Sequence, residues 1–142
     1  DATAAVNAAS SYTADSLGSQ SFTNWTNSNV GSVSLGEGVL NTQTLTESGS
    51  GTVEHVLVSL RVSHSDPTHL GFRLESPDGT VSTLLPPLTA LGTDFSSSSW
   101  IYLPSNAFYG ESKAGDWKLY IIDHYAGSTG TLVQWGLQFM HR

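Results

Sequence analysis

The stretch VEHVLVSLRVSH, residues 53–64, decides the fold class of this chain. Its positions 56, 58, 60 and 62 are Val, Val, Leu and Val, whereas Ser59 and Arg61 stand between them. Strict alternation of apolar and polar side chains is typical of a β-strand that buries one face. We therefore predict a long strand over Val53–Ser63 whose even-numbered side chains point into a core.

The residues that follow predict a loop and then a β-hairpin. The loop is HSDPTH, residues 64–69, and beyond it apolar and other residues alternate from Leu70 to Leu74. The sequence Ser-Pro-Asp-Gly at 76–79 has the residues that tight turns require, because glycine adopts the positive φ angles of such turns without steric cost. Thr80–Leu85 is then the returning strand of the hairpin, and a Pro-Pro pair ends it.

Five further segments have the composition of strands and are separated by clusters of Gly, Pro, Asn, Asp and Ser. Leu119–Ile122 is continuously apolar, which predicts a segment buried on both faces. Tyr120 and Ile122, on the face opposite Leu119 and Ile121, are either core of a second layer or a patch that meets a partner. Many short strands at regular spacing predict an all-β, jelly-roll-like β-sandwich of antiparallel strands, preceded by a short N-terminal helix or an extended linker. The segments are 21–26, Val39–Thr46, Trp100–Leu103, Asp116–Asp123 and Thr131–Met140, the last with Val133, Trp135, Leu137 and Phe139 on one face.

The composition excludes several classes of function. Only 12% of the 142 residues are charged, and the formal net charge is −7. This acidic balance argues against a nucleic-acid partner and against an anionic membrane surface, since both require clustered Lys and Arg. No apolar run approaches the ~18 residues of a membrane-spanning helix. The chain has no cysteine, which removes disulfides, thiolate metal sites and cysteine nucleophiles.

The first twenty residues differ from the rest of the chain. Residues 2–9 are rich in alanine and predict a short helix that Asp1 can cap, whereas residues 10–20 are rich in serine and predict a linker. The start DATAAVNAAS has neither a basic segment nor a leucine-rich core, so it is not a signal peptide. We therefore expect residues 1–20 to lie outside the sandwich domain, which spans residues 21–142.

Three segments of the chain resemble one protein family. They are VEHVLVSLRVSH at 53–64, FRLESPDGTVSTLL at 72–85 and GDWKLYIIDHYAGSTGTLVQWGLQF at 115–139. The motifs Ser-Pro-x-Gly-Thr, Gly-Asp-Trp and Gly-Thr-Leu-x-x-Trp occur in them in the family's order. Through these motifs, residues 38–140 resemble the P-domain (Homo B domain) of kexin- and furin-type subtilisin-like proteases. The initial DATAAVNAA resembles the closing helix of a subtilisin-like catalytic domain.

The resemblance implies a non-catalytic accessory domain of a secreted, bacterial-type serine protease, without a catalytic triad of its own. It implies that the domain packs on the catalytic domain of the same polypeptide and stabilises it, with residues 1–20 as the tail of that domain plus a linker. We expect a monomer. A second hypothesis is a binding module for a protein such as collagen or for a polysaccharide, because jelly-roll sandwiches often present exposed aromatic side chains. The candidates for such contacts are Trp25, Trp100, Tyr102, Phe108, Tyr109 and Tyr125.

Calcium is the metal that the resemblance implies, and acidic loops supply the oxygen ligands that it prefers. Asp116 and Asp123 end the same predicted strand, ~23 Å apart at ~3.3 Å per residue, so they cannot share an ion. Either Asp123 combines with the turn at Gly127–Gly130, or Asp94 or Glu111 combines with Asp116. The alternative is that these carboxylates cap turns or are solvated. The candidate ligands are Asp66, Asp94, Glu111, Asp116 and Asp123.

His64, Asp66 and His69 form the pattern H-x-D-x-x-H, which leaves two interpretations open. The three side chains could bind zinc, although the spacing is not that of a helical HExxH site. Alternatively, the segment is a solvated turn in which the Asp-Pro pair starts a bend. His55, in the Glu-His pair that the resemblance includes, is expected to be structural rather than catalytic.

Overall fold

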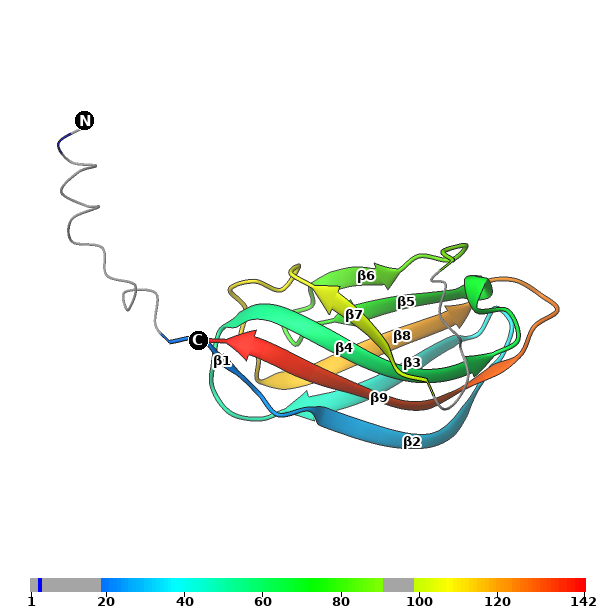
Figure 1. The fold of residues 1–142 in the computed structure, drawn as a ribbon, viewed down its shortest axis with the longest axis horizontal. Helices are drawn as coiled ribbons and strands as arrows, with labels where there is room; N and C mark the ends of the chain where they lie inside the picture. The colour runs from blue at the N-terminus through cyan, green and yellow to red at the C-terminus, as the bar shows by residue number, and fades with distance from the viewer. Residues whose placement is uncertain (1–2, 4–18, 91–98) are drawn as a thin grey trace.

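Two antiparallel β-sheets lie face to face in the computed structural model, which describes residues 3, 19–90 and 99–142 (Figure 1). The five-stranded sheet has the order β1-β9-β4-β7, with β2 also paired to β9, and the four-stranded sheet has the order β3-β8-β5-β6. The predicted all-β sandwich is therefore confirmed. The strands are β1 (Ser21–Phe22), β2 (Thr26–Leu35), β3 (Leu40–Glu47), β4 (Val53–His64), β5 (Leu70–Glu75), β6 (Val81–Leu85), β7 (Ile101–Ser105), β8 (Gly115–Asp123) and β9 (Gly130–His141).

The strand that the sequence predicts most clearly, β4, lies inside the five-stranded sheet between β9 and β7. Val56, Val58, Leu60 and Val62 are fully buried, as their alternation predicts. They share one hydrophobic core with residues of the four-stranded sheet. Burying an aliphatic side chain of this size contributes roughly 1.5–3 kcal/mol relative to leaving it exposed. The core between the two sheets is therefore what holds the sandwich together.

Two tryptophans are fully buried core anchors, Trp117 of β8 and Trp135 of β9. The ring centroid of Trp117 lies 5.0 Å from that of Phe108 and 5.0 Å from that of Phe139. Its indole Nε1 donates a 2.9 Å hydrogen bond to the backbone oxygen of Lys113, so its one polar group is satisfied. This aromatic cluster joins β8 of one sheet to β9 of the other.

The side-chain pattern of β9 differs from the prediction at its start. Leu132 is fully buried, whereas Val133, which the sequence places on the core face, is only half-buried. The cause is a β-bulge, because Arg61 pairs with Gln134 but the next residue, Val62, pairs with Leu132. One extra residue in β9 shifts the alternation by one position. The core assignment of Val133 is therefore wrong.

Two further strand predictions need correction. The sequence predicts one strand at 21–26, but the structure has the short β1 and the long β2. The strand β2 is rich in Ser and Asn, and its backbone pairs with β9. Its residue Leu35 is buried in the core. The sequence also ends a strand at Leu103, whereas β7 continues to Ser105 through Pro104. Among the described strands β7 pairs with β4 alone, and a proline is tolerated at such an edge.

The predicted turns are confirmed. Gly79 has a φ of 90°, and its N–H donates to the oxygen of Ser76 at 3.0 Å. In the loop before β5, a short 3-10 helix, η2 (Pro67–His69), begins at Asp66, whose side chain accepts a hydrogen bond from the N–H of Thr68 at 3.1 Å. The Asp-Pro pair therefore starts a bend, as the second interpretation of that loop predicts.

Some predictions concern residues that lie outside the described ranges. They are the N-terminal helix apart from Thr3, residues 10–18 of the expected linker, and most of the loop at 88–99 with Asp94. Within the described ranges, no helix has the length and the apolar character needed to cross a membrane.

Candidate functional site

Part of the outer face of the four-stranded sheet is apolar, although the face of a sheet opposite its core is commonly solvated and polar. Along β8, Leu119 and Ile121 are fully buried in the core, whereas Tyr120 and Ile122 point outward and are half-buried. Burial on both faces is therefore incomplete, and the alternative expectation, a surface patch at Tyr120 and Ile122, agrees better with the structure. The run is continuously apolar because Leu119 and Ile121 lie in the core, while Tyr120 and Ile122 lie on the outer face, where no described element covers them completely.

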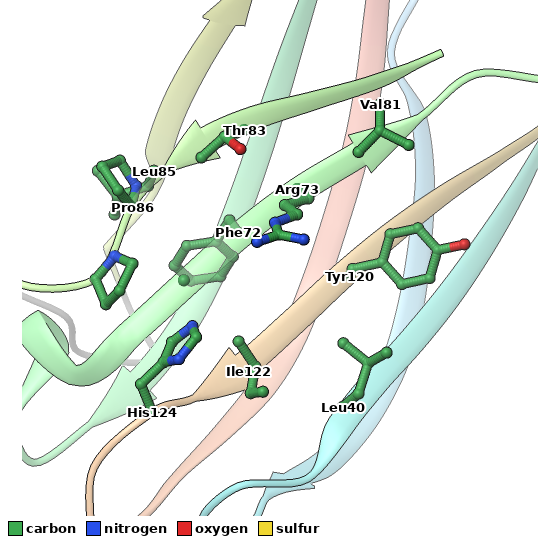
Figure 2. Close-up of a pocket in the computed structure, with 12 residues that line it drawn as sticks. Leu40, Phe72, Arg73, Val81, Thr83, Leu85, Pro86, Tyr120, Ile122 and His124 are labelled. Atoms are coloured by element: carbon green, nitrogen blue, oxygen red, sulfur yellow. The ribbon is translucent and has the colours of Figure 1, made fainter. Parts of the chain in front are cut away.

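Pairing across the sheet brings these outward side chains together. Ile122 of β8 pairs with Leu40 of β3 on one side and with Gly71 of β5 on the other. Tyr120 likewise pairs with Arg73 of β5. Figure 2 shows Leu40, Ile122 and Tyr120 as neighbours on this face. The register of three strands therefore places the apolar side chains of Leu40, Ile122 and Tyr120 together, with the exposed Arg73 beside them.

The patch is hollowed into an open groove with a volume of about 660 Å³. Gly71 helps to create this space, since a Cβ there would lie 2.9 Å from Nε2 of His124. Leu40 is 57% exposed and Val81 is 51% exposed, although both are fully apolar. Large exposed apolar patches mark interaction surfaces. We call this surface the docking face and define it by Leu40, Arg73, Val81, Thr83, Pro86, Pro87, Tyr120 and Ile122.

A small polar network borders the docking face. Lys118 Nζ donates to Glu75 Oε1 at 2.9 Å, and the Tyr120 hydroxyl donates to Glu75 Oε2 at 2.6 Å. The hydrogen bond from Tyr120, followed by that from Lys118, lowers the pKa of Glu75 below its ordinary value. The same contacts with Glu75 raise the pKa of Lys118 and of Tyr120. The network fixes the tyrosine ring at the edge of the groove.

A second group of ionisable residues lies at the end of β8. His64 Nε2 is 3.1 Å from Asp123 Oδ2, and both side chains are fully buried. His69 lies 3.8 Å from the other oxygen of Asp123 and 3.3 Å from an oxygen of Asp66. The H-x-D-x-x-H loop is thus tied to β8 through Asp123. The sequence contains all four residues but gives no signal that Asp123 belongs with the other three.

The structure separates the remaining calcium candidates. Asp116 begins β8, opposite the end with Asp123, and accepts a 2.6 Å hydrogen bond from Thr46. Glu111 lies in the turn before β8, and its backbone oxygen accepts a bond from Val53. Asp94 lies outside the described residues. Within the described ranges, the Asp, Glu and His side chains form no group of three that could hold a metal ion.

The aromatic candidates for a binding surface fall into separate places. Phe108 is fully buried against Trp117, so its assignment as a surface residue is wrong. Tyr109 is exposed beside Arg142, and Tyr125 lies near His69. The other three, Trp25, Trp100 and Tyr102, lie together on the five-stranded sheet.

The Glu54-His55 pair has structural contacts. Glu54 is buried and binds Arg142 and Gln20, while His55 Nδ1 lies within hydrogen-bond distance of the Asn106 side chain. These contacts tie the start of β4 to Gln20 before β1, to Arg142 after β9 and to Asn106 after β7.

Fold and surface together define the class of this protein: an all-β sandwich domain with an apolar outer face on one sheet. The chain belongs to the proprotein convertase P-domain family, whose sequence profile matches residues 53–139. The resemblance to this family, expected over residues 38–140, is therefore confirmed over residues 53–139.

Comparison with individual proteins agrees with this assignment. The chain is 32% identical over 97 residues to proprotein convertase subtilisin/kexin type 5 of Branchiostoma californiense, a match that covers 64% of this chain and 6% of that protein. It is 41% identical over 69 residues to endoprotease aex-5 of Caenorhabditis elegans, covering 49% of this chain and 12% of the relative. The chain thus spans a small part of the curated relatives.

One solved structure has the same fold over nearly the whole chain. It is the serine protease of Aeromonas sobria, which aligns with a TM-score of 0.82 and 23% sequence identity. The alignment covers 97% of this chain and 29% of that protease. At this identity the likeness establishes the fold.

Proposed function

We propose that this chain is a non-catalytic accessory domain of a secreted subtilisin-like serine protease, whose catalytic domain packs on the docking face. The observation that carries the proposal is the apolar groove of about 660 Å³ on that face. Family membership supports the choice of partner, because the relatives are named as proteases and are far longer than this chain.

The physical basis is burial of apolar surface shared by two domains. Interfaces between domains of one chain usually cover about 600–1,500 Å². A catalytic domain that covers Leu40, Val81 and Ile122 removes these side chains from water. The contact exists only while both domains are folded, so it opposes the unfolding of each. The accessory role is therefore thermodynamic and needs no chemistry in this chain.

The contacts of the buried histidine also support a non-catalytic role. One ring nitrogen of His64 faces Asp123, and the other lies 2.7 Å from the backbone oxygen of Asp66. A general base needs a ring nitrogen within reach of the proton that it removes from a substrate. Both nitrogens of His64 are engaged, and the side chain is fully buried. The pair with Asp123 thus serves to hold the loop.

We also propose that the protein works outside the cell and that calcium stabilises it. A chain without cysteine gains nothing from an oxidising compartment, so a bound ion is an alternative source of stability there. Such a site would need Asp94 or backbone oxygens in addition to the described carboxylates. Excess EDTA should lower the melting temperature, and added calcium should restore it; an unchanged melting temperature in EDTA contradicts the calcium proposal.

The proposed accessory role is tested by comparing the parent protease with and without this domain. We expect the truncated protease to mature poorly and to lose activity at a lower temperature than the complete protein. If both forms mature equally and survive heating equally, the accessory role is wrong.

A further inference from the structure

A second hollow lies on the outer face of the five-stranded sheet, and its floor is built from small residues. Gly136 of β9 and Ser59 of β4 pair with each other. A Cβ at position 136 would lie 2.2 Å from the Asn27 side-chain oxygen and 3.0 Å from Ser59 Oγ, so the floor depends on glycine. The row across the sheet is Asn27 of β2, Gly136 of β9, Ser59 of β4 and Tyr102 of β7.

Three aromatic rings form the walls of this hollow. The ring centroids of Trp25 and Tyr102 are 5.9 Å apart, and their planes are tilted by 54°. Trp100 lies 6.5 Å from Tyr102 with nearly parallel rings, and the guanidinium of Arg61 lies 5.5 Å from the Trp100 ring. Trp100 is 38% exposed and Tyr102 is 53% exposed. The rings therefore have free apolar surface at the mouth of the hollow.

The position of Trp25 is fixed by the segment between β1 and β2. Thr23 donates its N–H to the oxygen of Phe139 at 2.9 Å and accepts the N–H of Phe139 on its hydroxyl at 3.0 Å. The connection is thus held to β9 two residues before the tryptophan. The wall is preformed by the fold, which lowers the entropic cost of binding a ligand.

The hydroxyl of Ser59, in the floor of the hollow, has no hydrogen-bond partner among the described residues. Ser59 is 2% exposed. Buried hydroxyls are nearly always hydrogen-bonded, so an unpartnered one calls for an explanation. Ser59 lines the hollow together with the side-chain amides of Asn27 and Gln134. A ligand with hydrogen-bond acceptors would bond to the amides directly, and to Ser59 Oγ, which solvent does not reach, after a small movement of the wall.

We propose that this hollow, the aromatic slot defined by Trp25, Trp100, Tyr102, Asn27, Ser59 and Gln134, binds a proline-rich segment of a polypeptide in the polyproline II conformation. Such a segment has no internal hydrogen bonds, so its carbonyl oxygens are free to accept bonds from Ser59 and the two amides. Aromatic-lined grooves are a recurrent way to bind proline-rich segments. The slot has a volume of about 140 Å³, which suits one proline ring at a time.

A saccharide is the alternative occupant, because sugar rings also stack on aromatic side chains. The ring centroids of Trp25 and Tyr102 lie 5.9 Å apart, which is ordinary ring contact, so a ligand packs on the exposed faces of the rings and not between them. A proline-rich segment is favoured because it presents apolar pyrrolidine rings to these faces and free carbonyl oxygens to the side-chain amides of the floor. The slot and the docking face lie on different sheets, so a proline-rich polypeptide could bind while the catalytic domain occupies the docking face. The inference therefore goes beyond the proposed accessory role and does not depend on it.

The test is a titration of the 142-residue protein with a synthetic oligoproline peptide, followed by tryptophan fluorescence. We expect a saturable change, because Trp25 and Trp100 line the slot. Tyr102→Ala should weaken binding about tenfold or more. Tyr109→Ala is the matched control, since Tyr109 is also exposed but lies outside the slot, and it should leave the affinity unchanged. Equal losses in both variants, or no saturable signal, would overturn the proposal.

A second variant separates binding from folding. Ser59→Ala removes a hydroxyl that makes no bond in the free domain, so the melting temperature should stay the same or rise while oligoproline binds several-fold more weakly. Unchanged affinity in Ser59→Ala contradicts the role of the floor. Cellohexaose and an alanine peptide of equal length are the competing probes. Saturation by cellohexaose without saturation by oligoproline, or equal affinity for both peptides, would also overturn the proposal.

Discussion

The two outer faces of this sandwich share one core but have different chemistry. The docking face has one outward aliphatic side chain on its central strand β8, Ile122, which lies between Leu40 and Gly71. The aromatic slot has a serine and a glycine on its two central strands, with large rings at the sides. The first face is suited to continuous apolar contact, and the second to a narrow ligand with hydrogen-bond acceptors.

The difference shows how alternation in β-strands lets the two faces vary independently of the core. In β8 the inward residues Leu119 and Ile121 are fully buried, and in β4 the inward residues Val58 and Leu60 are fully buried. The inward positions of both strands are therefore equally apolar. Only the outward positions differ, because successive side chains point to opposite faces.

The largest expected effect comes from breaking the core that both faces share. Trp117→Ala removes a fully buried ring that contacts Phe108 and Phe139. We expect a loss of about 3–5 kcal/mol in the free energy of unfolding, measured by urea denaturation. Phe22→Ala, at a side chain that is 67% exposed, is the control and should change the stability by less than ~0.5 kcal/mol. Equal stability of the two variants would contradict the core described above.

A variant with an intermediate loss of stability should show that the two faces are independent of each other. Asp123→Asn replaces the buried carboxylate that faces His64 and ends β8, a strand of the sheet that carries the docking face. Weakening a buried polar contact of this kind costs about 1–3 kcal/mol. We expect a lower melting temperature in calorimetry with unchanged oligoproline affinity, because the slot lies on the other sheet. Equal damage to binding would mean that the two faces are coupled.

The smallest expected effect depends on pH. The folded state lowers the pKa of Glu75 below its ordinary value of 4.5, chiefly through the hydrogen bond from Tyr120. The ionised carboxylate therefore stabilises the fold above pH 4.5, and this contribution is lost as the pH falls through the lowered pKa. Glu75→Gln should melt slightly below the native protein near neutral pH, and the two curves should converge in acid. A constant difference at all pH values would contradict this account.

Much of the fold follows from local alternation. The pattern of β4 predicts its buried side chains because every second position is aliphatic, and the hairpin turn follows from Gly79 with its φ of 90°. The long β2 escapes prediction, since its stability comes from pairing with β9 rather than from its own polar side chains. The bulge at Val133 could not be predicted either, because it depends on how β9 pairs with β4 and not on the residues of β9 alone.

The sites are harder to predict than the strands. Tyr120 and Ile122 are recognisable as a second apolar face, but only the register places them beside Leu40 and Gly71. The aromatic slot needs residues from β2, β4, β7 and β9, which are distant in sequence and meet only through sheet order. Pairings of this range leave no local signal, so the sequence predicts candidates one by one but not their assembly.

The central claim is that the docking face, and not the slot, holds the catalytic domain. Leu40→Lys and Tyr102→Lys are matched variants, because the two side chains are 57% and 53% exposed on opposite sheets. The direct measurement is the temperature at which the parent protease loses half its activity. We predict a clear decrease for Leu40→Lys and none for Tyr102→Lys. Equal decreases, or a decrease for Tyr102→Lys alone, would contradict the account.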